Sequence, residues 1–586
     1  MSILDGSVRS SRVSILKAPS LRSSLVKSAP KVRFKLPDSK KIECILHEFA
    51  NGTNTRDYEN LVVLIRDAEL LDDDIFDLLT EATQCISLLS HELRLFVEAV
   101  LSLRWTHYSS NVTGIYKSFL LNLLSAHNYH VKYAVNKLVS NFIPETNDEW
   151  ICGIPNDSDL QKCVHIHWVL NILIKVVPMS QEVILNAFRS HFPYHKKSTH
   201  VHEFYIHNLL LVLEYQPEFR LEILTLIFSK LVILDVNAPK DEIEKAKCDF
   251  IADNSAIQMG GEDFEDKIHH TIGHTLDVCI DRIFNYFVSE CEDRRNGNLD
   301  WDKLKLLYRD VISIFDKIIL PTHNIHHIQF IIFYLCCFKT AISEAFLNYL
   351  WKKVCSPSIA SVVRQSAVCY IASFIARSNF IPLSMLKGTL QQMSTWAHSY
   401  ISTLDEVECV NFDVRTHSVF YSVCQAIFYV IAFRQKDLFN TKKNLSFLET
   451  LNLAKIVTCR LNPLRVCQPA VVKNFAAVTR TYQLAYCYSV IEHNSRNIMK
   501  TIYHDDKGST LTTDNILDSF FPFDPYVLKR SGEKIRHIYL HYRDNEEVPS
   551  QRQEMDVDDD FLCEQETSKH LLKFSYSCSP GFRVTQ

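Results

Sequence analysis

Residues 203–234 read EFYIHNLLLVLEYQPEFRLEILTLIFSKLVIL and contain two apolar helical runs. The runs cover Glu203–Tyr215 and Glu218–Leu234, and Gln216-Pro217 stands between them. Proline lacks a backbone N–H and disfavours helical geometry in the residue before it, so we expect neither helix to continue through Pro217. The stretch therefore predicts a helical hairpin, two helices joined by a short turn.

The pattern of helix, short break and helix continues from about residue 42 to residue 500. A further helical face has apolar residues at i, i+4, i+7, i+8 and i+11, which are Leu307, Val311, Ile314, Phe315 and Ile318. Prolines punctuate similar runs at Pro144, Pro178, Pro193, Pro321, Pro357, Pro382, Pro463 and Pro469. At roughly 40–47 residues per helix pair, about ten HEAT or armadillo units fit into this region.

The chain has only 12 glycines in 586 residues, which argues against Gly-rich nucleotide loops and a large β content. We therefore predict an all-α fold, a HEAT-like α-solenoid of stacked antiparallel helix pairs over residues 42–542. A compact multi-domain α-protein is the alternative.

Three segments depart from this pattern. Residues 1–41 carry ten Lys/Arg, two acidic residues and ten serines, which predicts a disordered basic arm. Such an arm is suited to binding nucleic acid, an acidic protein or an import receptor. A solvated tail is the equal alternative, and the sequence does not decide whether the arm contacts DNA. An acidic loop is expected at about 240–267, and residues 543–586 read as an acidic, serine-containing disordered tail.

Charge and cysteine content exclude several classes of protein. A net charge of −5 gives no reason to expect that the whole molecule binds nucleic acid. None of the 18 cysteines forms a C-x-x-C pair, and with no signal peptide we expect a reducing compartment. The longest apolar run, Ile328 to Phe338, is too short to cross a bilayer. These features predict a soluble intracellular protein without a membrane segment.

Motifs for catalysis are absent from the sequence: there is no H-E-x-x-H, G-x-S-x-G, P-loop or G-x-G-x-x-G. His270 and His274 share a helical face with Asp277 nearby, but zinc needs further ligands and a supporting second shell. Structural histidines are the simpler interpretation. We predict neither an enzyme nor a bound metal or cofactor.

An aromatic segment, DSFFPFDPYVLKRS, occupies residues 518–531. Pro522 and Pro525 make a continuous helix improbable there, so its aromatic rings should form an irregular plug. We predict that Phe520, Phe521 and Phe523 are buried against the last helices of the solenoid. Lys529 and Arg530 should be its exposed part, either contacting a partner or capping a helix.

Serines and threonines supply the candidate modification sites. Eight serines lie between Ser87 and Ser140 in helices that also carry Lys117, Lys132 and Lys137. Phosphate would change the charge of such a surface strongly, although serine is also common at helix caps. Ser198 and Thr199 follow a basic pair, and Ser579-Pro580 has the form of a proline-directed kinase site.

Several stretches, in order from about 90 to 535, together resemble one family, the RNA polymerase I-specific transcription initiation factors. They include Tyr205–Leu210, Leu234–Ala238, Leu307–Asp310 with Phe315–Lys317, Leu320–His323, Phe333–Cys336, Glu344–Phe346 with Leu350–Lys353, Arg364–Ala367, Phe380–Leu383, Leu461–Leu464, and Phe520–Pro525 with Leu528–Ser531. Each short segment is unspecific by itself, but the ordered set is strong evidence for the resemblance.

The resemblance implies a non-enzymatic HEAT-repeat protein of the nucleus and nucleolus. It leaves open whether the protein also shuttles to the cytoplasm. It implies binding to the stalk of RNA polymerase I, bridging to a promoter-bound core factor, a dimer when free, and control by protein kinases. The family's polymerase-facing serine patch matches Ser102, Ser109, Ser110 and Ser140. Its promoter-factor contact matches Arg377 and Ser378, although this chain lacks a second basic residue after Arg377.

A karyopherin-like or other α-solenoid scaffold is the competing interpretation, because a fold alone does not assign a function. A karyopherin should carry a ladder of Trp and Asn along its inner face. The six tryptophans of this chain are scattered and form no such ladder.

Overall fold

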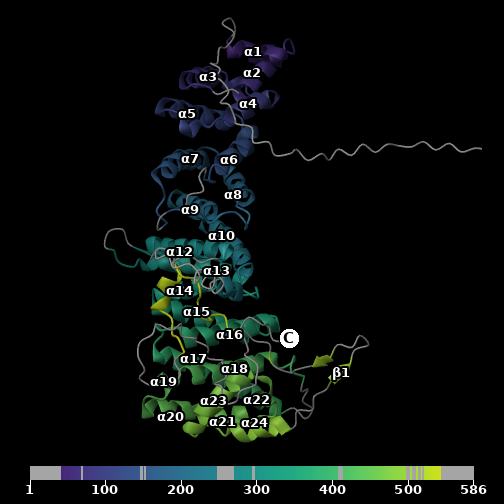
Figure 1. Ribbon diagram of the computed structural model, residues 1–586, viewed down its shortest axis with the longest axis vertical. Helices are drawn as coiled ribbons and strands as arrows, with labels where there is room; N and C mark the ends of the chain where they lie inside the picture. The colour runs from purple at the N-terminus through teal and green to yellow at the C-terminus, as the bar shows by residue number, and fades with distance from the viewer. Residues whose placement is uncertain are drawn as a thin grey trace, which may run out of the picture. The chain divides into compact units, whose positions relative to one another are not determined.

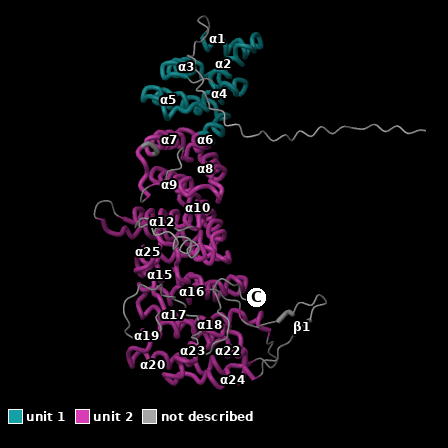
Figure 2. Tube along the Cα trace, viewed as in Figure 1, with its two compact units in different colours: residues 1–137 teal, residues 138–586 magenta. Residues whose placement is uncertain are grey.

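The computed structural model describes residues 41–67, 70–144, 150, 153–246, 270–292, 297–406, 413–496, 502–504, 510–512, 517 and 521–542. Within these residues the chain is almost entirely helical, as predicted (Figure 1). It divides into two compact units, residues 1–137 and 138–586 (Figure 2). The predicted basic arm before Lys41, the tail after Tyr542 and Ser579 lie outside the described residues.

Unit 1 is built from short amphipathic helices. They are α1 (Ile42–Ala50), α2 (Arg56–Asp67), α3 (Asp72–Gln84), α4 (Arg94–Leu101), α5 (Ser110–Ala126) and α6 (Val131–Ser140), with 3₁₀ turns η1 (Ile86–Leu88), η2 (His91–Leu93), η3 (Trp105–His107) and η4 (Asn128–His130). α6 runs across the boundary between the units. α2 packs on α4 and α3 on α5, which is the alternation expected of stacked helix pairs.

Unit 2 contains the longer helices. The first group comprises α7 (Asp157–Val176), α8 (Ser180–Ser190), α9 (Thr199–Tyr215), η6 (Pro217–Phe219), α10 (Arg220–Val236), α12 (Thr271–Cys291), α13 (Trp301–Ile314), η8 (Phe315–Ile319), α14 (Phe330–Cys337), α15 (Thr340–Cys355) and α16 (Ser361–Arg377). The second comprises α17 (Leu383–Asp405), α18 (Ser418–Phe433), α19 (Gln435–Leu438), α20 (Lys442–Thr450), α21 (Leu453–Val457), α22 (Pro463–Val466), α23 (Pro469–Thr481), α24 (Cys487–Arg496) and α25 (Gly532–Arg536).

The helices of unit 2 follow one another broadly in chain order from α7 to α18, and α20–α24 lie together beyond them (Figure 1). α25 departs from this order and lies between α12 and α15 (Figure 2). α16 packs on both α15 and α18, and every residue of α18 is buried. A helix that is apolar on all sides belongs in the interior, so α18 is a central core element of this unit.

The predicted hairpin is confirmed as α9, η6 and α10, with Pro217 at the first position of the 3₁₀ turn. α9 begins at Thr199, four residues earlier than the sequence indicated, and Ser198 precedes its first residue. The Tyr205 hydroxyl donates to the carbonyl oxygen of Phe188 at 2.9 Å, which ties α9 to the end of α8.

Two local expectations differ from the structure. Ile318 was placed on the buried face of its helix, but Ile319 is buried and Ile318 is only half-buried. The cause is the π-helical turn η8, which inserts one residue per turn and shifts the apolar face by one position. The acidic loop was expected to begin near 240, yet residues 240–246 are helical.

The described strands form one small antiparallel ribbon. β1 (Ile502–His504) pairs with β2 (Thr510–Thr512), with Tyr503 opposite Leu511. No described helix is both long enough and apolar enough to cross a membrane.

Candidate functional site

The described chain ends with residues 521–542, named here the C-terminal segment, which returns along helices far earlier in the sequence. It is irregular except for α25. Its contacts lie on α12, α14, α16 and α18 rather than on the last helices of the unit. The predicted aromatic plug is therefore buried, but against the middle of unit 2.

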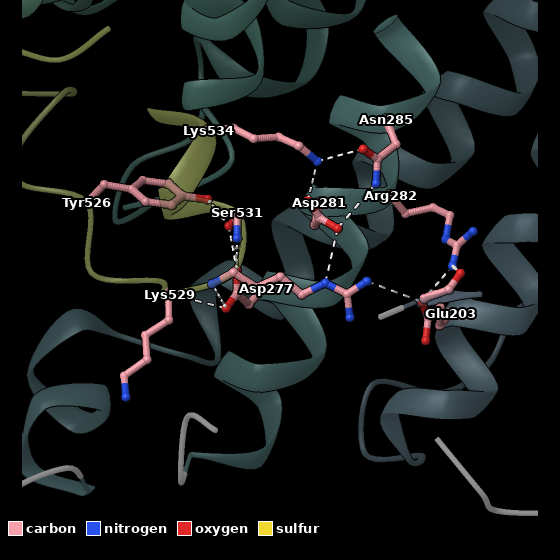
Figure 3. Close-up of polar contacts among 11 residues, drawn as sticks. Glu203, Asp277, Asp281, Arg282, Asn285, Tyr526, Lys529, Ser531 and Lys534 are labelled. Carbon is pink, nitrogen blue, oxygen red and sulfur yellow. Dashed lines mark hydrogen bonds and ion pairs between the residues drawn. The ribbon is translucent and has the colours of Figure 1, made fainter. Parts of the chain in front are cut away.

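Asp277 of α12 is the main polar anchor of the C-terminal segment (Figure 3). Its carboxylate accepts backbone N–H bonds from Lys529 at 3.1 Å, Arg530 at 2.9 Å and Ser531 at 2.7 Å. The Ser531 hydroxyl donates a further bond at 2.5 Å. Because Asp277 is 2% exposed, these donors supply the hydrogen bonds that water would otherwise provide.

A second acid on α12, one turn further on, binds the side chains of the segment (Figure 3). Asp281 accepts from the Arg530 guanidinium at 3.0 Å and from the Lys534 ammonium. The buried Glu203 of α9 pairs with Arg282 at 2.7 Å and lies 4.0 Å from the Arg530 guanidinium. Asp281 and Glu203 therefore both have cationic partners, unlike Asp277, which is satisfied by backbone N–H groups and a hydroxyl.

Gly153 is required where this ion-pair cluster meets the loop before α7. Its φ is +71°, and its carbonyl oxygen accepts from the Arg282 guanidinium at 2.6 Å. A Cβ at this position would collide with the guanidinium of Arg530. Any larger residue would therefore strain the backbone and displace an anchor of the C-terminal segment.

The aromatic rings of the segment fill the space between α14 and α16. Phe523 is fully buried, its N–H donates to the Ser373 hydroxyl at 3.0 Å, and its ring centroid lies 4.9 Å from that of Phe333. Phe521 stacks on Tyr429 of α18 at 4.5 Å. Tilted and stacked contacts of this kind add to the stabilisation from the area that the rings bury. Phe520 lies outside the described residues.

Tyr526 packs beside His327, which is held by a buried acid, Asp235. Asp235 accepts the backbone N–H groups of His326, His327 and Ile328 and pairs with the His327 ring at 2.9 Å. Burial is the largest single influence and acts to raise the pKa of Asp235, but the hydrogen bond and charge of His327, together with the backbone N–H bonds from His327 and Ile328, outweigh it and hold the pKa below its ordinary value. Burial raises the pKa of Tyr526, whose ring centroid lies 5.5 Å from that of His327.

The predicted promoter-factor contact, Arg377 and Ser378, lies under the C-terminal segment. Their side chains are 1% and 0% exposed. The Arg377 guanidinium lies over the rings of Phe433 and Tyr539, at 4.7 and 5.3 Å. The Arg377 carbonyl accepts from Leu540, and Ser378 forms a bridge with Tyr539. As placed here, neither residue can meet a partner unless residues 538–540 move away.

Lys529 and Arg530 were expected to be the exposed part of the segment, but both are half-buried, and Arg530 is bound by acids rather than free. Its backbone and guanidinium are both bound by acids of α12. Lys529 is half-buried and its backbone N–H belongs to the same anchor.

Three of the four predicted polymerase-facing serines lie in unit 1, and all three are exposed. Ser102 ends α4, where its hydroxyl donates to the Glu98 carbonyl at 2.7 Å and lies 3.1 Å from the Tyr133 hydroxyl. Ser109 and Ser110 begin α5. The Ser109 N–H donates to the Asp72 carboxylate at 3.0 Å.

The other candidate residues are dispersed. Ser140 is the last residue of α6 and belongs to unit 2, so the four serines do not fall within one unit. Ser198 is exposed, whereas Thr199 is 8% exposed and its hydroxyl lies 2.9 Å from that of Thr275. Modification of Thr199 would require this contact to open.

No group of three His, Cys, Asp or Glu side chains within the described residues is arranged to hold a metal ion. The ring of His270 instead caps α12, accepting the Gly273 N–H at 3.0 Å. Asp277, which the sequence placed beside His270 and His274, is occupied by the C-terminal segment.

Sequence reasoning missed the role of Asp277 and Asp281 as a docking site for residues 529–534. A signal was available: the acids stand one turn apart within the apolar run TLDVCIDRIF, where an unpaired carboxylate would be costly. The partner, about 250 residues further along, carries no sequence mark that identifies it.

Comparison with known proteins extends over most of this structure. Residues 38–547 match the family described as RNA polymerase I specific transcription initiation factor RRN3. The RNA polymerase I-specific transcription initiation factor RRN3 of Mus musculus is 36% identical over 591 residues, covering 94% of this chain and 89% of the mouse protein. The corresponding factor of Schizosaccharomyces pombe is 24% identical and covers 82% of each chain.

A solved structure supports the fold independently. The crystal structure of RNA polymerase I transcription initiation factor Rrn3 matches with a TM-score of 0.67 at 18% identity, covering 86% of this chain and 97% of that one. The family match spans both units, the hairpin and the C-terminal segment that closes over Arg377. The chain therefore belongs to the RNA polymerase I specific transcription initiation factor RRN3 family.

Proposed function

We propose that this protein is a nuclear initiation factor for RNA polymerase I that acts by binding, without catalysis. The observation that carries the proposal is the 36% identity to the mouse factor over nearly the whole chain. The finer steps are part of the same proposal: contact with the polymerase stalk, bridging to a promoter-bound core factor, control by kinases and residence in the nucleolus. No observation favours a karyopherin.

We place the polymerase contact on the exposed serines of unit 1, Ser102, Ser109 and Ser110. Phosphate would act differently at each of these serines. At Ser110, the first residue of α5, the helix dipole favours a negative charge. At Ser109, a phosphate would face the Asp72 carboxylate that now holds its N–H, and repulsion would loosen the junction of α3 and α5.

Ser102 lies where phosphate would alter the surface most. Its hydroxyl neighbours that of Tyr133, and the Lys137 ammonium lies 5.7 Å from the Tyr133 ring centre. A phosphate on Ser102 would therefore lie close to a cation that is exposed when the serine is unmodified. Modification would change both the charge and the hydrogen-bonding groups that a partner meets.

The test is affinity purification of the tagged full-length chain from growing cells. Recovery of RNA polymerase I subunits is expected, and recovery of nuclear-transport cargo instead would refute the assignment. A triple Ser→Asp variant at Ser102, Ser109 and Ser110 should lose most of the polymerase while keeping its circular dichroism spectrum. A control with the same added charge, at the exposed Ser358, Ser402 and Ser489, should retain it.

Bridging through Arg377 and Ser378 requires a conformational step in this proposal, because the C-terminal segment covers both residues. A core-factor complex would then bind a state in which residues 538–540 have moved. Ser140, Ser198, Thr199 and Ser579 stay candidate modification sites, to be checked by phosphopeptide mapping. Sedimentation of the free protein checks the predicted dimer.

A further inference from the structure

Near its C-terminal end, unit 2 carries a strong local excess of positive charge. From Leu438 to Ile491 the sequence has seven Lys/Arg and one acidic residue, Glu449, although the whole chain has a net charge of −5. The cations are Lys442, Lys443, Lys455, Arg460, Arg465, Lys473 and Arg480, and all seven are exposed. We call them the basic surface.

The basic surface is carried by α20 to α24, which lie together at the far end of unit 2 from α7 (Figure 1). α22 packs on α24, and α23 packs on α24 and α18. The two acids that flank this stretch are already engaged: Asp437 pairs with Arg434 at 2.7 Å, and Glu492 with Arg496 at 2.5 Å. Six cations, all but Arg460, have no ion-pair partner within the described residues.

Exposed aromatic rings accompany this charge. Tyr486 is 81% exposed and Tyr488 is 46% exposed, with the Arg480 guanidinium 5.3 Å from the Tyr488 ring centre. Tyr482 stacks on Phe439 at 3.9 Å, just before α20 begins. The surface therefore suits a polyanion that also presents apolar or aromatic groups.

This chain contains such a polyanion. Residues 543–566 have ten acidic and two basic residues, and Phe561-Leu562 directly follows the run Asp558-Asp559-Asp560. The described chain ends at Tyr542, whose ring centroid lies 5.5 Å from that of Phe433, the last residue of α18. α19 begins two residues later, and α20 with Lys442 and Lys443 follows it. The last described residue before the acidic stretch thus contacts the end of α18, from which the chain runs through α19 to Lys442 and Lys443.

We propose that the acidic stretch 543–566 binds the basic surface of α20–α24 within the same molecule. The proposal does not depend on the proposed function. A tethered ligand of this length has an effective concentration near ~1 mM, so even a weak ionic contact would be largely occupied. The stretch would then compete with any other polyanion, nucleic acid included, for the same cations.

The test uses the full-length chain and a carbodiimide, which joins a carboxylate to an amine only when the two are in contact. Mapping by mass spectrometry should find links from 543–566 to Lys442, Lys443, Lys455 or Lys473. The exposed Lys317 and Lys352 serve as controls and should link rarely. Mixing isotopically labelled and unlabelled chains separates links within a molecule from links between molecules. Equal linking to the control lysines, or links only between molecules, would overturn the proposal.

A second measurement tests the competition. A fluorescent oligouridylate is titrated into the full chain at about 0.15 M salt. Asp558→Asn, Asp559→Asn and Asp560→Asn together should raise its affinity about tenfold, because the tethered competitor is weakened. A control that removes three other exposed acids, at Asp73, Glu92 and Asp302, should raise it far less. Equal affinities for the full chain and the tail variant would show that the surface is open, contrary to the proposal.

Discussion

Replacing Asp277 by alanine should release the C-terminal segment from α12. The carboxylate accepts three backbone N–H groups and one hydroxyl from residues 529–531, and it is almost fully buried. Each donor left without a partner costs about 1–3 kcal/mol. Leaving all four donors unpaired would cost more free energy than the remaining contacts of residues 529–531 supply. The segment should therefore detach locally, so that its donors bond to water.

We expect the free energy of local opening at residues 529–531 to fall by about 3–5 kcal/mol, which corresponds to about 10²–10⁴-fold faster amide exchange there. Hydrogen exchange with mass spectrometry measures this directly. Asp302→Ala on α13 is the matched control, since the Asp302 side chain is 88% exposed and pairs only with Lys305. Unchanged exchange at 529–531 in the Asp277 variant would refute the reasoning.

Three further predictions concern the same unit. Phe523→Ala should lower the free energy of unfolding by about 3–5 kcal/mol, because a fully buried ring is lost, and urea denaturation measures it. Arg377→Ala should destabilise by about 2–3 kcal/mol through lost packing, whereas Arg377→Met should recover most of that; equal losses would argue against a packing role. Burial lowers the pKa of His167 and of His207 to about 4, so the unfolded state binds more protons as pH falls below about 6.5. Stability should therefore drop by about 2–4 kcal/mol between about pH 7 and pH 5, a loss reduced in His167→Gln.

The sequence was sufficient for the elements that depend on local pattern. Pro217 marked the turn of the α9–α10 hairpin because proline acts on its own backbone and that of its neighbour. The π-helical turn at Phe315–Ile319 was not predictable from spacing, because a regular helical period was assumed through it. The resemblance identified the family correctly, since an ordered set of short segments is specific even where each segment is not.

The candidate contacts were harder to predict because exposure is a tertiary property. Arg377 and Ser378 became candidates only through the family resemblance, which carries no information about their exposure in this chain. They are buried because residues 538–540, more than 150 positions away, pair with that edge. Arg530 likewise reads as a free cation until its acids on α12 are known. Neither outcome leaves a trace in the local sequence.

In a stack of helices each layer contacts mainly its neighbours, so stability is close to a sum of local terms. The C-terminal segment breaks that rule, because it bonds α12 through Asp277, α14 through Gln329 and Phe330, and α16 through Ser373. The C-terminal segment thus joins helices that are about 100 residues apart in the sequence. Opening any one layer therefore removes contacts from the others. Exchange protection in α12 and α16 should therefore fall together when Asp277 is removed. If α12 alone lost protection, the segment would be a passive cover rather than a link between layers.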